Sequence, residues 1–158
     1  MIYRGEELIE LRPWQKSALV RIRRNIDGIF LEALGGRGKT IATMAIIQEK
    51  KAERVLILNN KTAILNGWEK DAQELNLGYP VTFTVKTDKW LRTKANALRE
   101  AEKGLKTLRK KIWVRKLYRQ NPKYVELHEN VKRLKAELDY DVLVIDEWQD
   151  MCSNQTCK

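Results

Sequence analysis

A glycine-rich run between an apolar segment and a helix-forming segment constrains this chain more than any other feature. The run covers residues 35–40 and has the sequence Gly-Gly-Arg-Gly-Lys-Thr. Apolar residues before it predict a strand at 28–32, and those after it predict a helix at 40–52. Glycines allow the backbone to turn with its N–H groups pointing inward, and the helix N-terminus adds positive partial charge. This order of elements therefore predicts a cradle for phosphate groups.

The residue types that end the run match a nucleotide phosphate loop. In such a loop Lys39 reaches the β- and γ-phosphates, and the hydroxyl of Thr40 binds magnesium. The backbone of the residues before them surrounds the phosphates, and these residues are Gly35, Gly36, Arg37 and Gly38. Ala33 stands where the strict pattern has glycine, so the match is to the shorter G-x-G-K-T core. The alternative is a glycine turn with a chance Lys-Thr pair.

A second motif lies about a hundred residues later, where two carboxylates follow an apolar run. The run Val142 to Ile145 predicts a strand buried on both faces, so Asp146 and Glu147 emerge at its carboxyl edge, where α/β sheets bind ligands. Asp146 is expected to hold magnesium, and Glu147 to orient and deprotonate an attacking water. A solvated turn is the alternative. Together the two motifs predict binding of ATP with Mg²⁺.

The rest of the chain, apart from its middle, alternates predicted strands and helices. Helices are expected at 13–25, 40–52 and 62–75, and strands at 28–32, 54–59, 81–85 and 142–145. This alternation is typical of an α/β domain with a parallel sheet. We expect residues 1–158 to form a single domain of this class.

The middle segment, residues 87–138, follows a different pattern. Apolar residues recur every three or four positions on both sides of Asn121-Pro122, which predicts two helices with a break between them. The chain has 31 Lys or Arg and 21 Asp or Glu, and 16 of the basic against 5 of the acidic residues lie between Lys89 and Leu138. We therefore expect a basic helical hairpin inserted into the α/β domain.

This charge favours a polyanionic partner for the hairpin. Lysine and arginine side chains would contact the phosphates of a nucleic acid without reading its sequence, and the candidates are Arg109, Lys110, Lys111, Arg115 and Lys116. The alternative is a solvated helix pair whose charges keep it soluble.

Two further segments carry a resemblance to a known family. Residues 11–15 have the sequence Leu-Arg-Pro-Trp-Gln, and residues 59–70 join a predicted strand to a helix that contains Leu65, Trp68 and Glu69. With the phosphate loop and the Asp-Glu pair, these segments resemble the first motor domain of superfamily 2 helicases and translocases, particularly the Swi/Snf-like branch. The resemblance covers residues 11–75 and 140–150.

The resemblance implies a RecA-like fold and roles for further residues. Gln15 would contact adenine, and Lys61, Thr62 and Trp68 would touch the tracked nucleic-acid strand, which we expect to be DNA. An ordinary helix start is the alternative for Gln15, and core packing is the alternative for Trp68. After Glu147 the family commonly has Ala-His, whereas this chain has Trp148 and Gln149.

Motors of this family need a second RecA-like domain, which supplies arginine fingers, and a sheet strand after the Asp-Glu motif. We therefore expect the chain to be a fragment, a split protein, or a chain that another polypeptide completes. Weak or no ATPase activity is expected of it alone. A non-enzymatic module that binds nucleic acid or protein is the second hypothesis. A small kinase or GTPase is less favoured, because the chain lacks the guanine-reading N-K-x-D motif.

Cysteine content and hydropathy add two expectations. Cys152 and Cys157, with His128 far upstream, do not supply the paired ligands of a zinc site, so two free thiols are expected. The sequence has no apolar run near 18 residues and no secretory segment, and we expect a cytoplasmic protein.

Overall fold

Two compact units make up the chain. The computed structural model describes residues 2–24, 31, 36–111 and 120–146. The first unit comprises Met1–Lys86 and Tyr140–Lys158, and we name it the sheet unit. The second comprises Thr87–Asp139, and we name it the hairpin unit.

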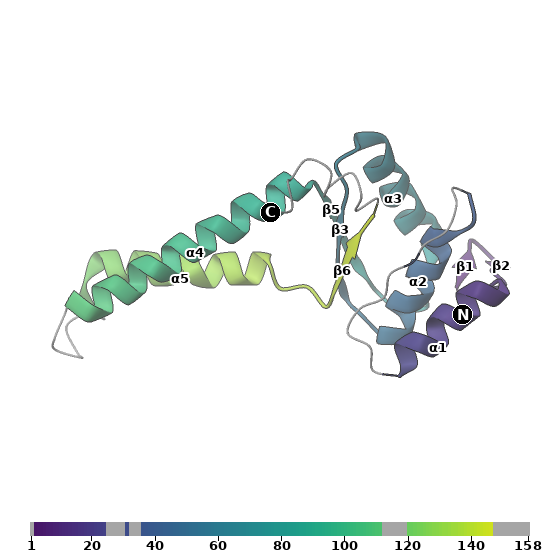
Figure 1. Cartoon of the computed structure of the whole chain (residues 1–158), viewed down its shortest axis with the longest axis horizontal. Helices are drawn as coiled ribbons and strands as arrows, with labels where there is room; N and C mark the ends of the chain where they lie inside the picture. Colours follow the sequence, from purple (N-terminus) through teal and green to yellow (C-terminus); the bar gives the residue numbers. More distant parts are fainter. Residues whose placement is uncertain (1, 25–30, 32–35, 112–119, 147–158) are drawn as a thin grey trace, which may run out of the picture. The chain divides into compact units, whose positions relative to one another are not determined.

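The sheet unit is built around a parallel sheet. Strand β3 (Arg54–Leu58) lies between β5 (Thr82–Lys86) and β6 (Val142–Ile145) and pairs in parallel with both (Figure 1). This arrangement confirms the predicted α/β class and its parallel sheet. The strand expected at 28–32 lies outside the described residues except for Leu31, which is not in a strand.

The described part of the sheet unit contains three helices, and they begin close to their predicted positions. They are α1 (Pro13–Arg23), α2 (Lys39–Lys50) and α3 (Thr62–Glu74). Helices α2 and α3 bury apolar side chains against β3, and α1 packs on α2. A cluster of buried side chains in this unit comprises Ile2, Met44, Ala45, Ile47, Ala52, Val55, Ile57, Trp68, Leu75 and Leu77.

Strand β6 differs from the prediction that it is buried on both faces. Val142 and Val144 pack against the core, whereas Leu143 and Ile145 are 50% and 48% exposed. Side chains alternate between the two faces of a strand, and in the described part of the chain only one face of β6 packs on the core. The prediction of burial on both faces was therefore wrong.

A small antiparallel sheet at the N-terminus was not predicted. It has the order β2-β1-β4, with β1 at Tyr3–Arg4, β2 at Glu7–Leu8 and β4 at Leu75–Asn76. Each strand has two residues, which is too short to show a hydrophobic period in the sequence. The sheet attaches the N-terminal segment to the end of α3.

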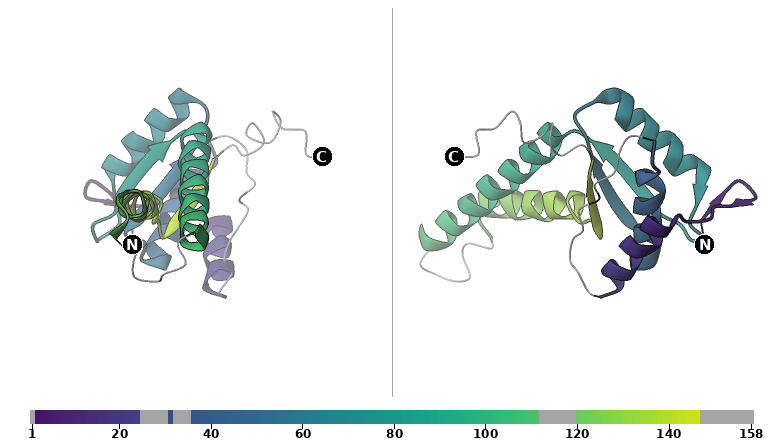
Figure 2. Two further views of the ribbon diagram at one scale, coloured as in Figure 1. Left: turned by 90° about the vertical axis from the view of Figure 1, so that its left-hand side faces the viewer. Right: turned by 45° about the vertical axis from the view of Figure 1, so that its right-hand side comes forward.

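The described residues of the hairpin unit form two antiparallel helices, α4 (Asp88–Lys111) and α5 (Pro122–Glu137), which lie side by side (Figures 1 and 2). Asn121 begins α5, because its side chain accepts hydrogen bonds from the backbone N–H groups of Lys123 and Tyr124. The buried side chains between the helices are Ala101, Leu105, Tyr124 and Val131. No helix in the described residues is both long and apolar enough to span a membrane.

Candidate nucleotide site

Two glycines of the predicted phosphate loop adopt left-handed backbone conformations. Gly36 has a φ of +70° and Gly38 a φ of +85°, which side chains with a Cβ rarely adopt. A Cβ on Gly38 would also lie 2.9 Å from Nε2 of Gln15. Gly38 is the N-cap of α2, so its conformation determines where that helix begins. Glycine at position 38 is therefore required by both backbone geometry and space.

A cavity of about 280 Å³ lies at the N-terminus of α2. The loop side is formed by Gly36, Gly38, Lys39, Thr40 and Ile41, and Arg4 and Asp71 complete the lining. The first backbone N–H groups of a helix have no partner within it and attract anions, and the Lys39 ammonium reinforces this effect, whereas the charge of Arg4 is paired with Asp71 and Glu74. The cavity therefore fits phosphate groups, and it is lined by the two residues predicted to contact phosphate and magnesium, Lys39 and Thr40.

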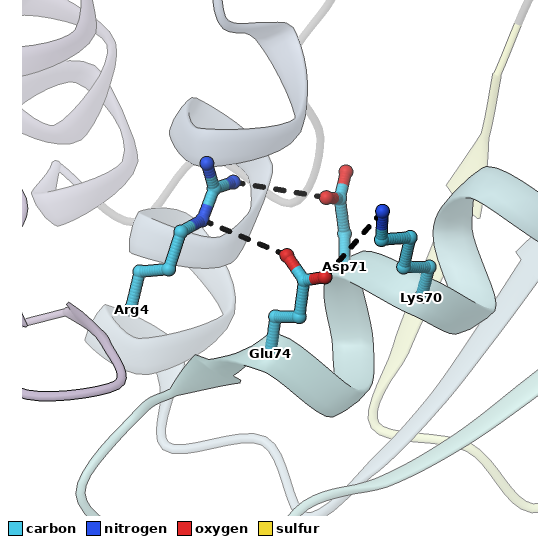
Figure 3. A network of polar contacts seen from close by, with 4 residues as sticks. All are labelled: Arg4, Lys70, Asp71 and Glu74. Atoms are coloured by element: carbon cyan, nitrogen blue, oxygen red, sulfur yellow. Dashed lines mark ion pairs between the residues drawn. The ribbon is translucent and has the colours of Figure 1, made fainter.

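Arg4 connects the small sheet to α3 at the wall of this cavity. It forms ion pairs with Asp71 at 3.8 Å and Glu74 at 3.9 Å, and Glu74 also pairs with Lys70 at 3.6 Å (Figure 3). Burial raises the pKa of Asp71, and the positive charge of Arg4 partly offsets this. Exposed ion pairs of this kind contribute up to about 1 kcal/mol, so they orient Arg4 more than they stabilise the fold.

Gln15 supports the phosphate loop from α1. Its side chain is buried, its Oε1 accepts a hydrogen bond from the backbone N–H of Arg12 at 2.7 Å, and its Nε2 donates to the carbonyl oxygen of Gly38 at 2.8 Å. Arg12 adds a hydrogen bond from Nη1 to the carbonyl oxygen of Arg37. Both ends of the Gln15 amide are thus used within the protein. This geometry favours the helix-start alternative, and contact with adenine stays a prediction.

Asp146 is held in place by three hydrogen bonds from β3 and α3. Its backbone N–H donates to the carbonyl oxygen of Leu58 at 3.0 Å, and its own carbonyl oxygen accepts from Nδ2 of Asn59 at 3.1 Å. The indole Nε1 of Trp68 donates to the carboxylate oxygen Oδ2 at 2.8 Å. One carboxylate oxygen is therefore fixed by the indole, and the other, Oδ1, is oriented with it.

Helix α3 contacts both halves of the candidate site. Trp68 holds the Asp146 carboxylate, and Asp71, three residues later, lines the cavity of the phosphate loop. Residues three apart are neighbours on one face of a helix. One turn of α3 thus contacts both the phosphate cavity and the carboxylate at the end of β6. These two features come from segments about a hundred residues apart in the sequence.

The residues predicted to touch the tracked strand fall into two groups. Lys61 and Thr62 are exposed at the N-terminus of α3, and the side chain of Asn59 fixes this end by accepting the backbone N–H of Lys61 at 2.7 Å. Trp68 is only 5% exposed and belongs to the core. Its burial favours packing over contact with nucleic acid. Sequence reasoning missed Asn59, since a single amide after a strand carries no distinctive pattern.

The hairpin residues predicted to contact nucleic acid differ in their surroundings. Arg109 donates two hydrogen bonds to the hydroxyl oxygen of Tyr124, at 3.2 and 2.9 Å, and lies over its ring. Lys110 is exposed, and Lys111 is the last residue of α4. Four of the predicted site residues lie outside the described residues, and these are Gly35, Glu147, Arg115 and Lys116.

A glycine loop at a helix N-terminus and a carboxylate at the end of a parallel strand define a class of nucleotide-binding α/β domains. The family model described as "Type III restriction enzyme, res subunit" matches residues 8–150. The chain belongs to this family, which makes it a helicase-like, ATP-dependent motor domain of the superfamily 2 N-terminal type. The match confirms the superfamily of the resemblance and does not distinguish the Swi/Snf-like branch. No curated protein and no solved structure matches the chain.

Proposed function

We propose that the chain binds ATP and Mg²⁺ in the cavity at the N-terminus of α2, as the first motor domain of a DNA-dependent ATPase, helicase or translocase. One observation carries the proposal. Helix α3 contacts the phosphate-loop cavity through Asp71 and the strand-end carboxylate of Asp146 through Trp68. A bound nucleotide and its metal need these two features on the same side of the sheet.

The described residues of the site, and Gly35 and Glu147 from the sequence motifs, each have a role in this proposal. The backbone N–H groups of residues 35–38 and the Lys39 ammonium bind the phosphates, and Gln15 keeps Gly38 in the required conformation. The hydroxyl of Thr40 and Oδ1 of Asp146 would hold Mg²⁺, which commonly has few protein ligands. Glu147 would orient and deprotonate the attacking water. The metal would supply positive charge against the charge that develops on the phosphates.

The resemblance supports the remaining parts of the proposal. A second motor domain, on this polypeptide or another, would supply arginine fingers, so the chain alone should hydrolyse ATP weakly. Lys61 and Thr62 at the exposed start of α3 would contact the tracked strand. Membership of the Swi/Snf-like branch and a cytoplasmic location belong to the same proposal.

Nucleotide affinity of two matched glycine variants tests the site. Gly38→Ala places a Cβ at a φ of +85° and 2.9 Å from Gln15 Nε2, and we expect at least tenfold weaker Mg²⁺–ATP binding by isothermal titration calorimetry. Gly67→Ala is the control, because no atom lies within 4 Å of that Cβ on α3 and helices favour alanine. It should bind ATP as the unchanged protein does. Equal affinity of both variants, or no Mg²⁺-dependent ATP binding by the unchanged protein with DNA and a second domain present, would contradict the proposal.

A non-enzymatic nucleic-acid-binding module is the second candidate function, and the cationic excess of the hairpin favours it. In that case charge reversal at Arg109, Lys110 and Lys111 would abolish nucleic-acid binding, whereas Lys39→Ala would leave it intact. The motor proposal expects Lys39→Ala to abolish ATP binding and any coupling between ATP and nucleic acid. Titrations of both variants with ATP and with DNA separate the two functions.

A further inference from the structure

The two helices of the hairpin unit carry very different charge. Helix α4 contains nine Lys or Arg against three Asp or Glu, and α5 contains four against three. A general requirement for solubility would not concentrate the excess on one helix of a pair. The excess charge of the hairpin therefore belongs to α4.

Four of the cations on α4 lie on one face, and we name them the α4 stripe. They are Arg99, Lys103, Lys106 and Lys110, and their spacing of four, three and four residues keeps them within one side of a helix. This side is opposite the one that packs on α5 through Leu98, Ala101, Leu105 and Leu108. All four side chains are exposed, and within the described part of the chain no ion pair joins them to a carboxylate.

Several other cations among the described residues of the hairpin have partners inside it. Lys94 pairs with Glu137 across the two helices, and Lys135 pairs with Glu102 at 2.9 Å. Arg92 pairs with Asp88 along α4. The two pairs that join the helices, with the hydrogen bonds of Arg109 to Tyr124, connect α4 to α5.

The outward face of α5 gives the contrast within the same unit. It mixes both signs, with Glu126, Glu129, Lys132 and Arg133 all exposed. A phosphate backbone approaching this face would meet carboxylates as well as cations. The face of α4 that carries the stripe has one carboxylate at its edge, Glu102, which pairs with Lys135 of α5, so among the described residues this face is predominantly positive.

We propose that the α4 stripe binds the phosphate backbone of a nucleic acid. The proposal rests on the nucleic-acid partner of the proposed function and gives it a surface. The eleven residue steps from Arg99 to Lys110 cover about 16 Å at 1.5 Å per residue. This length matches about five phosphates of one strand at about 3.4 Å each. Because the stripe offers charge without groups placed to read base edges, binding should be independent of sequence and sensitive to salt.

A pair of double variants tests the stripe with a matched charge change. Lys103→Gln with Lys106→Gln removes two stripe cations. Lys123→Gln with Lys132→Gln removes two exposed cations from α5. We expect the stripe variant to bind a 30-base-pair DNA roughly tenfold more weakly at 50 mM salt by fluorescence anisotropy, with a salt slope reduced by about 2. The DNA affinity of the α5 variant should fall by less than threefold. Equal losses in both, or no binding by the unchanged chain, would overturn the proposal.

Three further measurements separate this proposal from its rivals. Circular dichroism of the stripe variant should match the unchanged chain, since its side chains point away from α5. Polyglutamate should compete poorly with DNA; competition as strong as unlabelled DNA would indicate an acidic protein as partner and overturn the proposal. ATP binding by the stripe variant should be unchanged. If the unchanged chain never binds ATP but the stripe variant loses DNA affinity, only the motor proposal is contradicted. If the unchanged chain binds ATP but the stripe variant keeps the DNA affinity of the unchanged chain, only the stripe proposal is contradicted.

Discussion

The sheet unit and the hairpin unit use polar and charged side chains in different ways. Near the candidate site of the sheet unit, Gln15, Asn59 and Asp146 each have fixed hydrogen-bond partners on another element. In the hairpin unit, some cations pair across the helices while the α4 stripe stays exposed. From this difference we expect the proposed function of the sheet unit to depend on geometry, and that of the hairpin unit to depend on the number and sign of charges. Four predictions test this comparison.

The largest effect is expected from core truncations, one in each unit. Ile57 on β3 is fully buried, and Ile57→Ala should lower the free energy of unfolding of the sheet unit by about 4 kcal/mol. Leu105→Ala in the hairpin core should cost about 2 kcal/mol, since a two-helix unit collapses around a small cavity more easily. Native-state hydrogen exchange measures each unit separately. Equal loss of protection in both units for either variant would mean that the units unfold together.

Trp68→Phe tests the dependence of the sheet unit on geometry. The substitution keeps an aromatic ring in the core but removes the N–H that donates to Asp146. We therefore expect the free energy of unfolding, measured by urea denaturation, to fall by about 2 kcal/mol. Mg²⁺ should also strengthen ATP binding less than in the unchanged protein, because Oδ1 is no longer oriented. Trp90→Phe on α4 is the control and should leave Mg²⁺–ATP affinity unchanged. Identical magnesium dependence in both variants would show that the indole does not position the carboxylate.

A matched pair of tyrosines compares single hydroxyl groups in the two units. Tyr124→Phe removes the acceptor of two Arg109 hydrogen bonds in the hairpin, and Tyr79→Phe removes a donor to the Ile47 carbonyl oxygen in the sheet unit. Each substitution should lower the free energy of unfolding of its unit by about 1 kcal/mol. Hydrogen exchange should show each loss in its own unit. A Tyr124→Phe effect within error of zero would mean that the Arg109 contact contributes nothing to hairpin stability.

The smallest effect is a pH dependence at the start of β3. The carboxylate of Asp141 accepts backbone hydrogen bonds from Arg54 and Glu53, and these bonds hold its pKa below the ordinary 3.8. The resulting stabilisation is therefore complete above pH 3.8 and is lost as pH falls through the lowered pKa. Asp141→Asn should lower stability at pH 7 and differ less from the unchanged protein near pH 2. A difference that is constant with pH would contradict this cause.

Periodicity and motif order were sufficient to predict the larger elements. Alternating helices and strands predicted α1, α2, α3, β3 and β5 to within about two residues, because each buries a clear apolar face. The Asn121-Pro122 pair predicted the start of α5, since Asn caps the helix and Pro is compatible with its first turn. The phosphate loop was predicted because glycine, lysine and threonine at that spacing have few other uses together.

Contacts between distant segments could not be predicted in the same way. The exposed face of β6 depends on which elements cover the sheet, and an apolar run of four residues does not contain that information. The roles of Trp68 and Gln15 depend on partners 78 and 23 residues away. The free and paired cations of the hairpin have the same residue types, so only the packing of α4 on α5 distinguishes them.

The buried amide of Asn59 has a consequence for engineering and for sequence variation. It donates to the carbonyl oxygen of Asp146 and accepts the backbone N–H of Lys61, so it needs a donor at one end and an acceptor at the other. Aspartate has the same shape but would turn a lone pair toward that carbonyl, and leucine would leave both groups unpaired. Chemical deamidation of Asn59 would convert its amide into the carboxylate of aspartate without any mutation. Position 59 is thus a single place where a change of one side-chain group would loosen the join between the two strand ends.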